Sequence, residues 1–223
     1  MSQDDASDPR DRLIEAAVAH VPFDGWSPAA LKAAAADIGM PPREAVARFP
    51  GGARDMIAWH SAHGDRRMIA ALAAMDLPSL KIRERIAAAV MTRLRQNAPA
   101  REAIRRALAI LAMPHNAPLS MRLLYRTVDA MWRAAGDTAT DWNFYSKRGL
   151  LSGVYTSTLM VWLNDDSEDF AETEAFLHRR ISDVMKVPKL TARVSALGAA
   201  LPKRLKAFRR FAPRRPGRGF RAV

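Results

Sequence analysis

The chain has 223 residues, 49% of them hydrophobic, which excludes wholesale disorder and is enough for one large domain with or without an appended tail. Cysteine is absent, which excludes disulfides and thiolate metal sites. The formal net charge is +12, and the excess lies in residues 179–223, which hold 14 basic residues and one acidic residue. Because residues 1–60 are net negative, we expect the C-terminal segment to contact any acidic surface that the protein meets.

The first 60 residues show the spacing of apolar residues that is typical of short helices. We expect one helix that ends before Pro22, a second that Ser27 caps and Gly39 ends, and a short third in the sequence PREAVARF. Residues 1–9 are acidic and are predicted to be disordered, whereas residues 10–60 are predicted to form a compact three-helix unit. The segment is similar to the helix-turn-helix region of tetracycline-repressor-like regulators.

This three-helix unit lacks the charge that DNA binding needs. Residues 40–55 hold three arginines against Glu44 and Asp55, and the position of a recognition helix is mostly alanine. Affinity for DNA depends on neutralising phosphates with Lys and Arg. We therefore do not expect DNA as a partner and interpret the unit as a scaffold.

Six further helices are predicted, and strand-like alternation is scarce. The expected helices cover residues 53–74, 78–96, 99–113, 119–135, 140–163 and 168–185, and the fifth of these is capped by Thr140 or Asp141. The apolar run in 149–164 is short and rich in Ser and Thr, so we interpret it as a buried helix rather than a membrane span. The predicted fold class is all-α, a bundle over residues 61–187 preceded by the three-helix unit and followed by a tail.

Residues 188–223 form the predicted tail, a basic amphipathic helix followed by an Arg- and Pro-rich end. Apolar residues recur at helical spacing from Leu190 to Phe208, with Lys and Arg between them. This pattern is typical of a helix that lies in a membrane interface and binds an anionic surface. A packed terminal helix and a nucleic-acid-binding helix are alternatives. The expected membrane-binding residues are Leu197, Leu201, Lys203, Arg204, Leu205, Phe208 and Arg209.

Candidate catalytic and metal-ligating residues are few. His115 lies beside Asn116 between two prolines, where a structural role is the simpler interpretation. Asp137 and Asp141 could form a carboxylate pair, but they flank a helix boundary where capping explains them equally well. His60 and His63 are one turn apart with no evident third ligand. We therefore expect no catalytic residues, no metal site and no cofactor.

Residues 111–181 carry several uncommon residues at fixed offsets, and this segment closely resembles the ubiquinone-biosynthesis accessory family, the ninth protein of the coenzyme Q pathway. The motifs that carry the resemblance are Pro114-His115-Asn116, Val128-Asp129-x-Met131-Trp132, Ala135-Gly136-Asp137, Thr140-Asp141-x-Asn143, Tyr145-x-Lys147-Arg148, Tyr155, Asp166-Ser167 and Phe176-Leu177. The resemblance extends more weakly over residues 10–187. It implies a tetracycline-repressor-like fold and a non-catalytic, lipid-binding accessory protein.

The same resemblance implies the ligand and the partners. Family members bind an isoprenoid lipid or quinone precursor in a helical pocket and present it to a di-iron hydroxylase while a C-terminal amphipathic helix binds the membrane. The pocket is expected between the fifth and ninth helices. The expected lipid-binding residues are Leu111, Leu124, Val128, Leu151, Val154, Tyr155, Leu159 and Trp162, although each could equally be an ordinary core residue. Gly149, Ser152, Gly153, Thr156 and Ser157 could leave room for a ligand or for close helix packing.

Three aromatic residues crowd the start of the eighth helix, at Trp142, Phe144 and Tyr145. Successive helical residues are about 100° apart, so one core cannot bury all three. The resemblance places a surface that docks the hydroxylase here, and exposed aromatic residues beside Arg are typical of interfaces. The expected partner-binding residues are Met131, Asp141, Phe144, Tyr145 and Arg148. The alternative is that all three rings pack among neighbouring helices.

A transcription regulator of the tetracycline-repressor type, with a ligand pocket that controls DNA binding, is the competing function. The start of the sequence lacks the pattern of a mitochondrial transit peptide, so we expect a cytoplasmic protein associated peripherally with the bacterial inner membrane. The exact lipid, the type of hydroxylase and the oligomeric state, including a homodimer, remain open.

Overall fold

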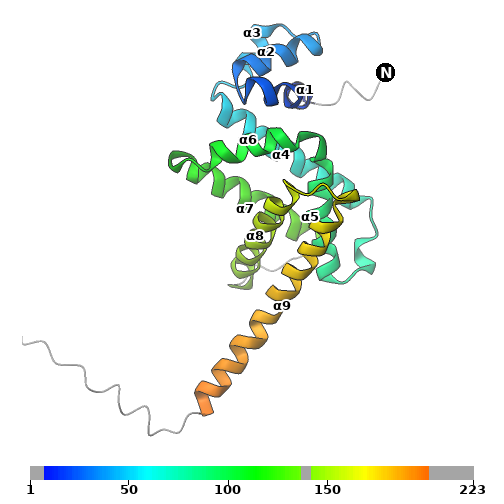
Figure 1. Ribbon diagram of the computed structural model, residues 1–223, viewed down its shortest axis with the longest axis vertical. Helices are drawn as coiled ribbons and strands as arrows, with labels where there is room; N and C mark the ends of the chain where they lie inside the picture. Colours follow the sequence, from blue (N-terminus) through cyan, green and yellow to red (C-terminus); the bar gives the residue numbers. More distant parts are fainter. Residues whose placement is uncertain (1–7, 137–141, 201–223) are drawn as a thin grey trace, which may run out of the picture. The chain divides into compact units, whose positions relative to one another are not determined.

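The computed structural model of the chain describes residues 8–136 and 142–200, and within these ranges the side chains of 142–146 and 186–200 are not described. The described residues form helices and short 3-10 turns, with no strand among them. The α-helices are α1 (Pro9–Asp24), α2 (Pro28–Asp37), α3 (Pro42–Ala47), α4 (Ala53–Ala73), α5 (Ile82–Gln96), α6 (Arg101–Leu111), α7 (Ala117–Ala134), α8 (Trp142–Trp162) and α9 (Ala171–Ala200), shown in Figure 1. The all-α prediction is confirmed.

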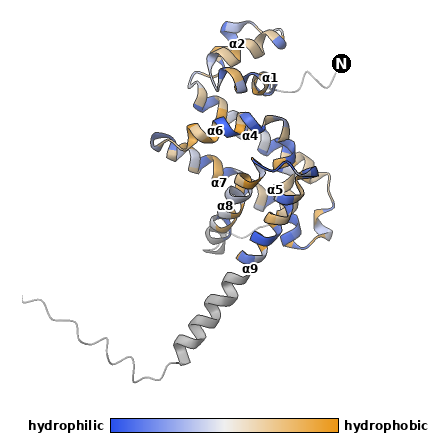
Figure 2. Ribbon diagram, viewed as in Figure 1, coloured by the Kyte–Doolittle hydropathy of each residue, from blue (hydrophilic) through white to orange (hydrophobic). Residues whose placement is uncertain are grey.

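The chain divides into two compact units between Ile181 and Ser182, so that α9 belongs partly to each. Within the first unit, hydrophobic and hydrophilic residues are interspersed along each helix, as expected for helices that bury one face (Figure 2). The expected boundary at 187/188 remains a prediction.

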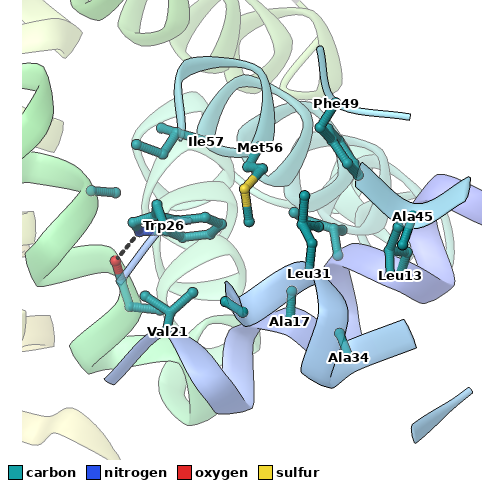
Figure 3. Packing of buried hydrophobic residues seen from close by; sticks show 14 of the residues in the cluster. Leu13, Ala17, Val21, Trp26, Leu31, Ala34, Ala45, Phe49, Met56 and Ile57 are labelled. Carbon is teal, nitrogen blue, oxygen red and sulfur yellow. Dashed lines mark hydrogen bonds between the residues drawn. The ribbon is translucent and has the colours of Figure 1, made fainter. Parts of the chain in front are cut away.

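Helices α1, α2 and α3 form the predicted three-helix unit, and their core extends into the rest of the first unit. Leu13, Leu31 and Phe49 pack with Met56 and Ile57 of α4 (Figure 3), and the same cluster includes residues of α6 and α7. Each such side chain, when fully buried, stabilises the fold by about 1.5–3 kcal/mol.

Trp26 links the α1–α2 loop to α6. Its indole Nε1 donates a hydrogen bond of 2.9 Å to the Ala103 carbonyl (Figure 3). The ring is buried, with 4% of its surface exposed, and lies 5.5 Å from the His60 ring. A buried indole N–H needs such a partner, so this bond fixes the loop against the bundle.

Three of the predicted helix ends are wrong for identifiable reasons. Helix α1 continues through Pro22, because a proline in the last turn removes only one backbone hydrogen bond and Gly25 still closes the helix by donating to the Val21 carbonyl at 2.9 Å. Helix α5 begins at Ile82 rather than at Pro78, because Glu84 accepts a hydrogen bond of 3.0 Å from the Lys81 backbone N–H and caps the helix there.

The third wrong end concerns α9, which was expected to stop near Met185 before a separate tail helix. Instead α9 continues through Pro188 to Ala200. Proline keeps φ in the helical range, and Lys and Leu next in sequence favour the helix. The side chain of Leu197 is not described, and the other expected membrane-binding residues, from Leu201 onward, lie outside the described residues.

Candidate functional site

A cavity of about 180 Å³ lies among α4, α5, α6, α7 and α8 in the first unit. Its apolar lining is supplied by Ile57, Ile104, Ala107, Leu108, Leu111, Leu123, Leu124 and Leu159. Its polar lining is supplied by His60, Ser61, Arg93, Asn97, Ser120, Thr127, Tyr155 and Thr156. The site was expected between the fifth and ninth helices, but α4 contributes to the described cavity and α9 does not.

Arg93 of α5 is the charged residue of the cavity wall, and it is held rigidly. Its Nε donates to the Asp65 carboxylate at 3.2 Å and its Nη2 donates to the Ser61 carbonyl at 3.1 Å. Its Nη1 is buried and has no hydrogen-bond partner. Thr127 donates to the same carboxylate at 2.9 Å. The guanidinium is therefore fixed in place with one donor still free.

Gly64 of α4 makes room for this guanidinium. A Cβ atom at position 64 would lie 2.3 Å from Arg93 Nη1, far inside van der Waals contact. A glycine in the middle of a helix costs about 1 kcal/mol relative to alanine, so its presence here has a packing reason.

Burial shifts the pKa values of the other ionisable groups around the cavity in the direction that favours their neutral forms. Burial, and after it the positive charge of Arg93, lowers the pKa of His60 to about 3, so its ring is neutral at pH 7. Burial raises the pKa of the Tyr155 hydroxyl. Burial also raises the pKa of Asp65, although the nearby Arg93 charge opposes that rise.

Four of the eight expected lipid-binding residues line the cavity, namely Leu111, Leu124, Tyr155 and Leu159. The other four are buried but do not line it, namely Val128, Leu151, Val154 and Trp162. The sequence reasoning missed Arg93, Thr127 and Ser61. No local signal marks Arg93, because Thr92 and Arg95 beside it are also polar and the residues that it packs against, Gly64 and Asp65, lie on α4.

The small residues of α8 mostly do not form this site. Thr156 lines the cavity, but Gly149 and Gly153 are exposed, and a Cβ atom at either would meet nothing within 4 Å. Ser152 and Ser157 donate their hydroxyl hydrogens to backbone carbonyls one turn earlier in the helix. Among the residues that the structure describes, the two glycines therefore contribute neither to the cavity nor to close helix packing.

Two of the expected partner-binding residues are buried, contrary to the prediction that they are exposed. Met131 has 0% of its surface exposed and Arg148 has 2%. Arg148 Nε donates to the Asp129 carboxylate at 2.7 Å, and this ion pair joins α8 to α7 and draws the side chain inward. Asp141 lies outside the described residues, and the side chains of Trp142, Phe144 and Tyr145 are not described.

The remaining candidates from the sequence have structural contacts. The Asn116 side chain donates to the Ile110 carbonyl at 2.9 Å, and the neighbouring His115 is exposed. His63 lies 2.8 Å from Glu15, joining α4 to α1. Among the residues that the structure describes there is no cluster of potential metal ligands. None of the helices in the described ranges has the length and apolar character needed to cross a membrane.

Comparison with known proteins identifies the family. The COQ9 family model matches residues 117–188. The mitochondrial ubiquinone biosynthesis protein COQ9 of Bos taurus is 35% identical over 197 residues, which cover 85% of this chain and 61% of the relative. COQ9-B of Xenopus laevis is 34% identical, with coverage of 85% and 67%. The chain belongs to the COQ9 family. It spans about three fifths of the length of the first of these COQ9 relatives.

The fold of this COQ9 family member is also that of a known class of regulators. The crystal structure of a TetR transcriptional regulator from Nitrosomonas europaea superposes with a TM-score of 0.65 at 22% identity, covering 80% of this chain and 99% of that one. The likeness confirms the predicted tetracycline-repressor-like fold and concerns the fold alone.

The expected cellular location is wrong. We expected a cytoplasmic protein at the bacterial inner membrane, but the COQ9 relatives from Bos taurus, Homo sapiens and Rattus norvegicus are all named as mitochondrial proteins. These names point to mitochondria. The expectation rested on the composition of the first residues, which carries less information than similarity over 197 residues.

Proposed function

We propose that the chain is a non-catalytic lipid-binding protein of ubiquinone biosynthesis, which holds an isoprenoid quinone precursor and delivers it to a membrane-associated hydroxylase. Its relatives' names support the role in ubiquinone biosynthesis. The observation that carries the lipid-binding part is the cavity, whose wall has eight apolar residues beside eight polar ones, of which Arg93 and Thr127 are held by hydrogen bonds to Asp65. Small-molecule sites in proteins commonly pair apolar walls with placed polar groups that orient the ligand.

The charge of the three-helix unit argues against the competing function of a DNA-binding regulator. In α3 and its flank, Arg48 forms an ion pair with Glu44, so that one of the few available cations is already neutralised. Binding to phosphates through this helix would have to break that pair. The repressor-like fold does not by itself favour regulation, because one fold hosts many functions.

The lipid-binding proposal is tested by purifying the full chain from a host that makes ubiquinone and identifying bound lipid by native mass spectrometry and solvent extraction. The variant Leu124→Trp places an indole in the cavity and should remove the bound lipid. The variant Met121→Trp changes an exposed residue of the same helix and should retain it. A wild-type chain that carries no isoprenoid and shifts specific genomic DNA fragments in a gel would refute the proposal.

Delivery of the lipid requires two further surfaces, one that docks the hydroxylase and one that binds the membrane. We assign hydroxylase docking to Asp141, Phe144 and Tyr145, and membrane binding to the basic tail, residues 188–223. A chain carrying Phe144→Lys and Tyr145→Lys should retain lipid but no longer retain a di-iron hydroxylase in a pulldown. Unchanged retention would remove the docking role and leave lipid binding intact.

A further inference from the structure

We propose that a basic hollow bordered by α1, α4 and α7 binds a terminal phosphate group, carried by a small soluble molecule or by a lipid head group. The hollow has a volume of about 380 Å³ and shares no lining residue with the cavity described above. Four arginines from four parts of the chain line it, namely Arg10 of α1, Arg48 of the α3–α4 turn, Arg66 of α4 and Arg126 of α7. This site is independent of the proposed lipid-binding function.

Two of the four arginines have no acidic partner in the part of the chain that the structure describes. Arg66 and Arg48 each pair with a carboxylate at 2.5 Å, whereas Arg10 and Arg126 form no ion pair with any described residue. Bringing like charges together is unfavourable unless an anion balances them. An anion that enters the hollow therefore meets positive charge that the protein itself leaves unbalanced.

Arg10 is held by aromatic rings instead of by an acid. Its guanidinium carbon lies 4.9 Å from the centre of the Trp59 ring and 5.9 Å from the centre of the Phe49 ring. The Trp59 ring is itself fixed, because its indole N–H donates to the Asp11 carboxylate at 2.8 Å. A cation–π contact uses the flat face of a guanidinium, whereas its N–H donors lie in the plane. The donors of Arg10 therefore remain available to a ligand.

The other arginines add donors of the same kind. The Arg66 guanidinium carbon lies 5.4 Å from the centre of the same Trp59 ring. Arg48 Nε is buried without a hydrogen-bond partner, which is costly for a donor that has lost its water. A phosphate group carries a charge of about −1.5 to −2 near pH 7 and three strong acceptor oxygens, and the planar fork of arginine matches those oxygens in pairs. A phosphate can therefore satisfy several of these donors at once.

The shape of the site favours a terminal phosphate over the backbone of DNA. The four arginines belong to different elements and converge on one hollow, into which the end of a molecule can fit. A duplex presents its phosphates in rows, which proteins neutralise with cations spread along the duplex. Asp55 is the one acidic residue among those that line the hollow, and its carboxylate accepts the Gly51 backbone N–H at 2.5 Å. The lining keeps an excess of positive charge.

NMR spectroscopy of the full chain tests the proposal, with the indole N–H signal of Trp59, assigned from Trp59→Phe, as the reporter. Titration with glycerol 3-phosphate should shift this signal until it saturates, whereas glycerol should not shift it. The variant Arg10→Gln with Arg126→Gln removes the two cations that lack acidic partners. It should bind glycerol 3-phosphate at least about 10-fold more weakly, the lower limit expected for the loss of one hydrogen bond to a charged group.

The matched control is Arg12→Gln with Arg122→Gln, which removes two exposed arginines from the same two helices, neither of which lines the hollow. The control should bind glycerol 3-phosphate as tightly as the wild type. An equal loss of binding in both double variants, or no shift of the Trp59 signal in the wild-type chain, overturns the proposal. If the Arg10 and Arg126 variant does not fold, as judged by circular dichroism, the wild-type titration still decides.

Flotation with vesicles of phosphatidylcholine and phosphatidic acid identifies the source of the phosphate. If a lipid head group supplies it, the variant without Arg10 and Arg126 should float less than the control variant. Equal flotation of the two, with glycerol 3-phosphate still bound by the wild type, assigns the site to a soluble phosphate. A short DNA duplex that shifts the Trp59 signal at lower concentration than glycerol 3-phosphate overturns the proposal. These outcomes leave the lipid-binding proposal untouched, because the cavity is a separate site.

Discussion

The close approach of Arg93 to Gly64 predicts that replacing this helical glycine with alanine destabilises the fold, opposite to the usual effect of that substitution. Replacing a glycine in the middle of a helix with alanine ordinarily stabilises a protein by about 1 kcal/mol. At position 64 the new methyl carbon would lie 2.3 Å from Arg93 Nη1, so the guanidinium would have to move. We therefore expect Gly64→Ala to destabilise the folded chain.

The magnitude follows from the hydrogen bonds that hold the guanidinium. Moving it lengthens the bonds from Nε to Asp65 and from Nη2 to the Ser61 carbonyl, now 3.2 and 3.1 Å. Hydrogen bonds to charged groups contribute about 1.5–3 kcal/mol each. Losing one of them outweighs the helix gain of about 1 kcal/mol, which leaves a net loss of about 0.5–2 kcal/mol in the free energy of unfolding.

Urea denaturation of Gly64→Ala measures this loss directly. In a chain that already carries Asp65→Asn with Arg93→Gln, the shorter side chain relieves the crowding, and Gly64→Ala should there be stabilising by about 1 kcal/mol. If Gly64→Ala stabilises the otherwise wild-type chain, the close packing of Arg93 on α4 is not what requires glycine, and the reasoning is refuted.

Three further predictions concern other parts of the chain. Burial opposes ionisation of Asp165, but hydrogen bonds from Ser167 and Thr173 outweigh it and lower its pKa to about 2. Because the folded-state pKa of Asp165 lies below its usual value, its ionised carboxylate stabilises the fold above about pH 4, and this stability is lost as the pH falls toward 2. The urea midpoints of the wild type and of Asp165→Asn should therefore converge as the pH is lowered over that range. Arg148→Met removes one of the two arginines that pair with Asp129, the one on α8. Because Arg133 still pairs with that carboxylate at 2.8 Å, we expect a loss of only about 2 kcal/mol in the free energy of unfolding, measured by thermal unfolding. An unchanged melting temperature would contradict the role of the Arg148–Asp129 pair. Removing residues 189–223 should abolish flotation with anionic phospholipid vesicles, whereas equal flotation of the full and shortened chains would exclude the tail as the membrane-binding segment.

Helical periodicity and capping residues were sufficient to predict an all-α chain and most of its helices, whereas the repressor-like fold was predicted from the family resemblance. Ser27 caps α2 as expected, accepting hydrogen bonds from the Ala29 and Ala30 backbone N–H groups at 3.1 and 3.4 Å, and Gly39 adopts the positive φ that ends the helix. The prolines were less informative. A proline signals a helix end only where the lost hydrogen bond matters, and neither Pro22 nor Pro188 ends its helix.

The candidate site was only half predictable, because apolar spacing marks which residues face inward but not which of them border an empty space. Val128 and Leu124 occupy the same helix at the same spacing, yet only Leu124 lines the cavity. Arg93 could not be placed because charged residues are normally exposed, and what buries it is a glycine and an aspartate on another helix. Long-range pairs of this kind leave no local pattern.

The three-helix unit and the cavity share part of one wall. Ile57, Ala107 and Leu123 belong to the core that packs beneath α1 and α2, and the same three residues border the space among α4 to α8. A fragment beginning after residue 60 would lack Ile57, and Ala107 and Leu123 would be exposed to water. The three-helix unit therefore supports part of the wall of the proposed lipid site, a structural role that does not depend on DNA binding.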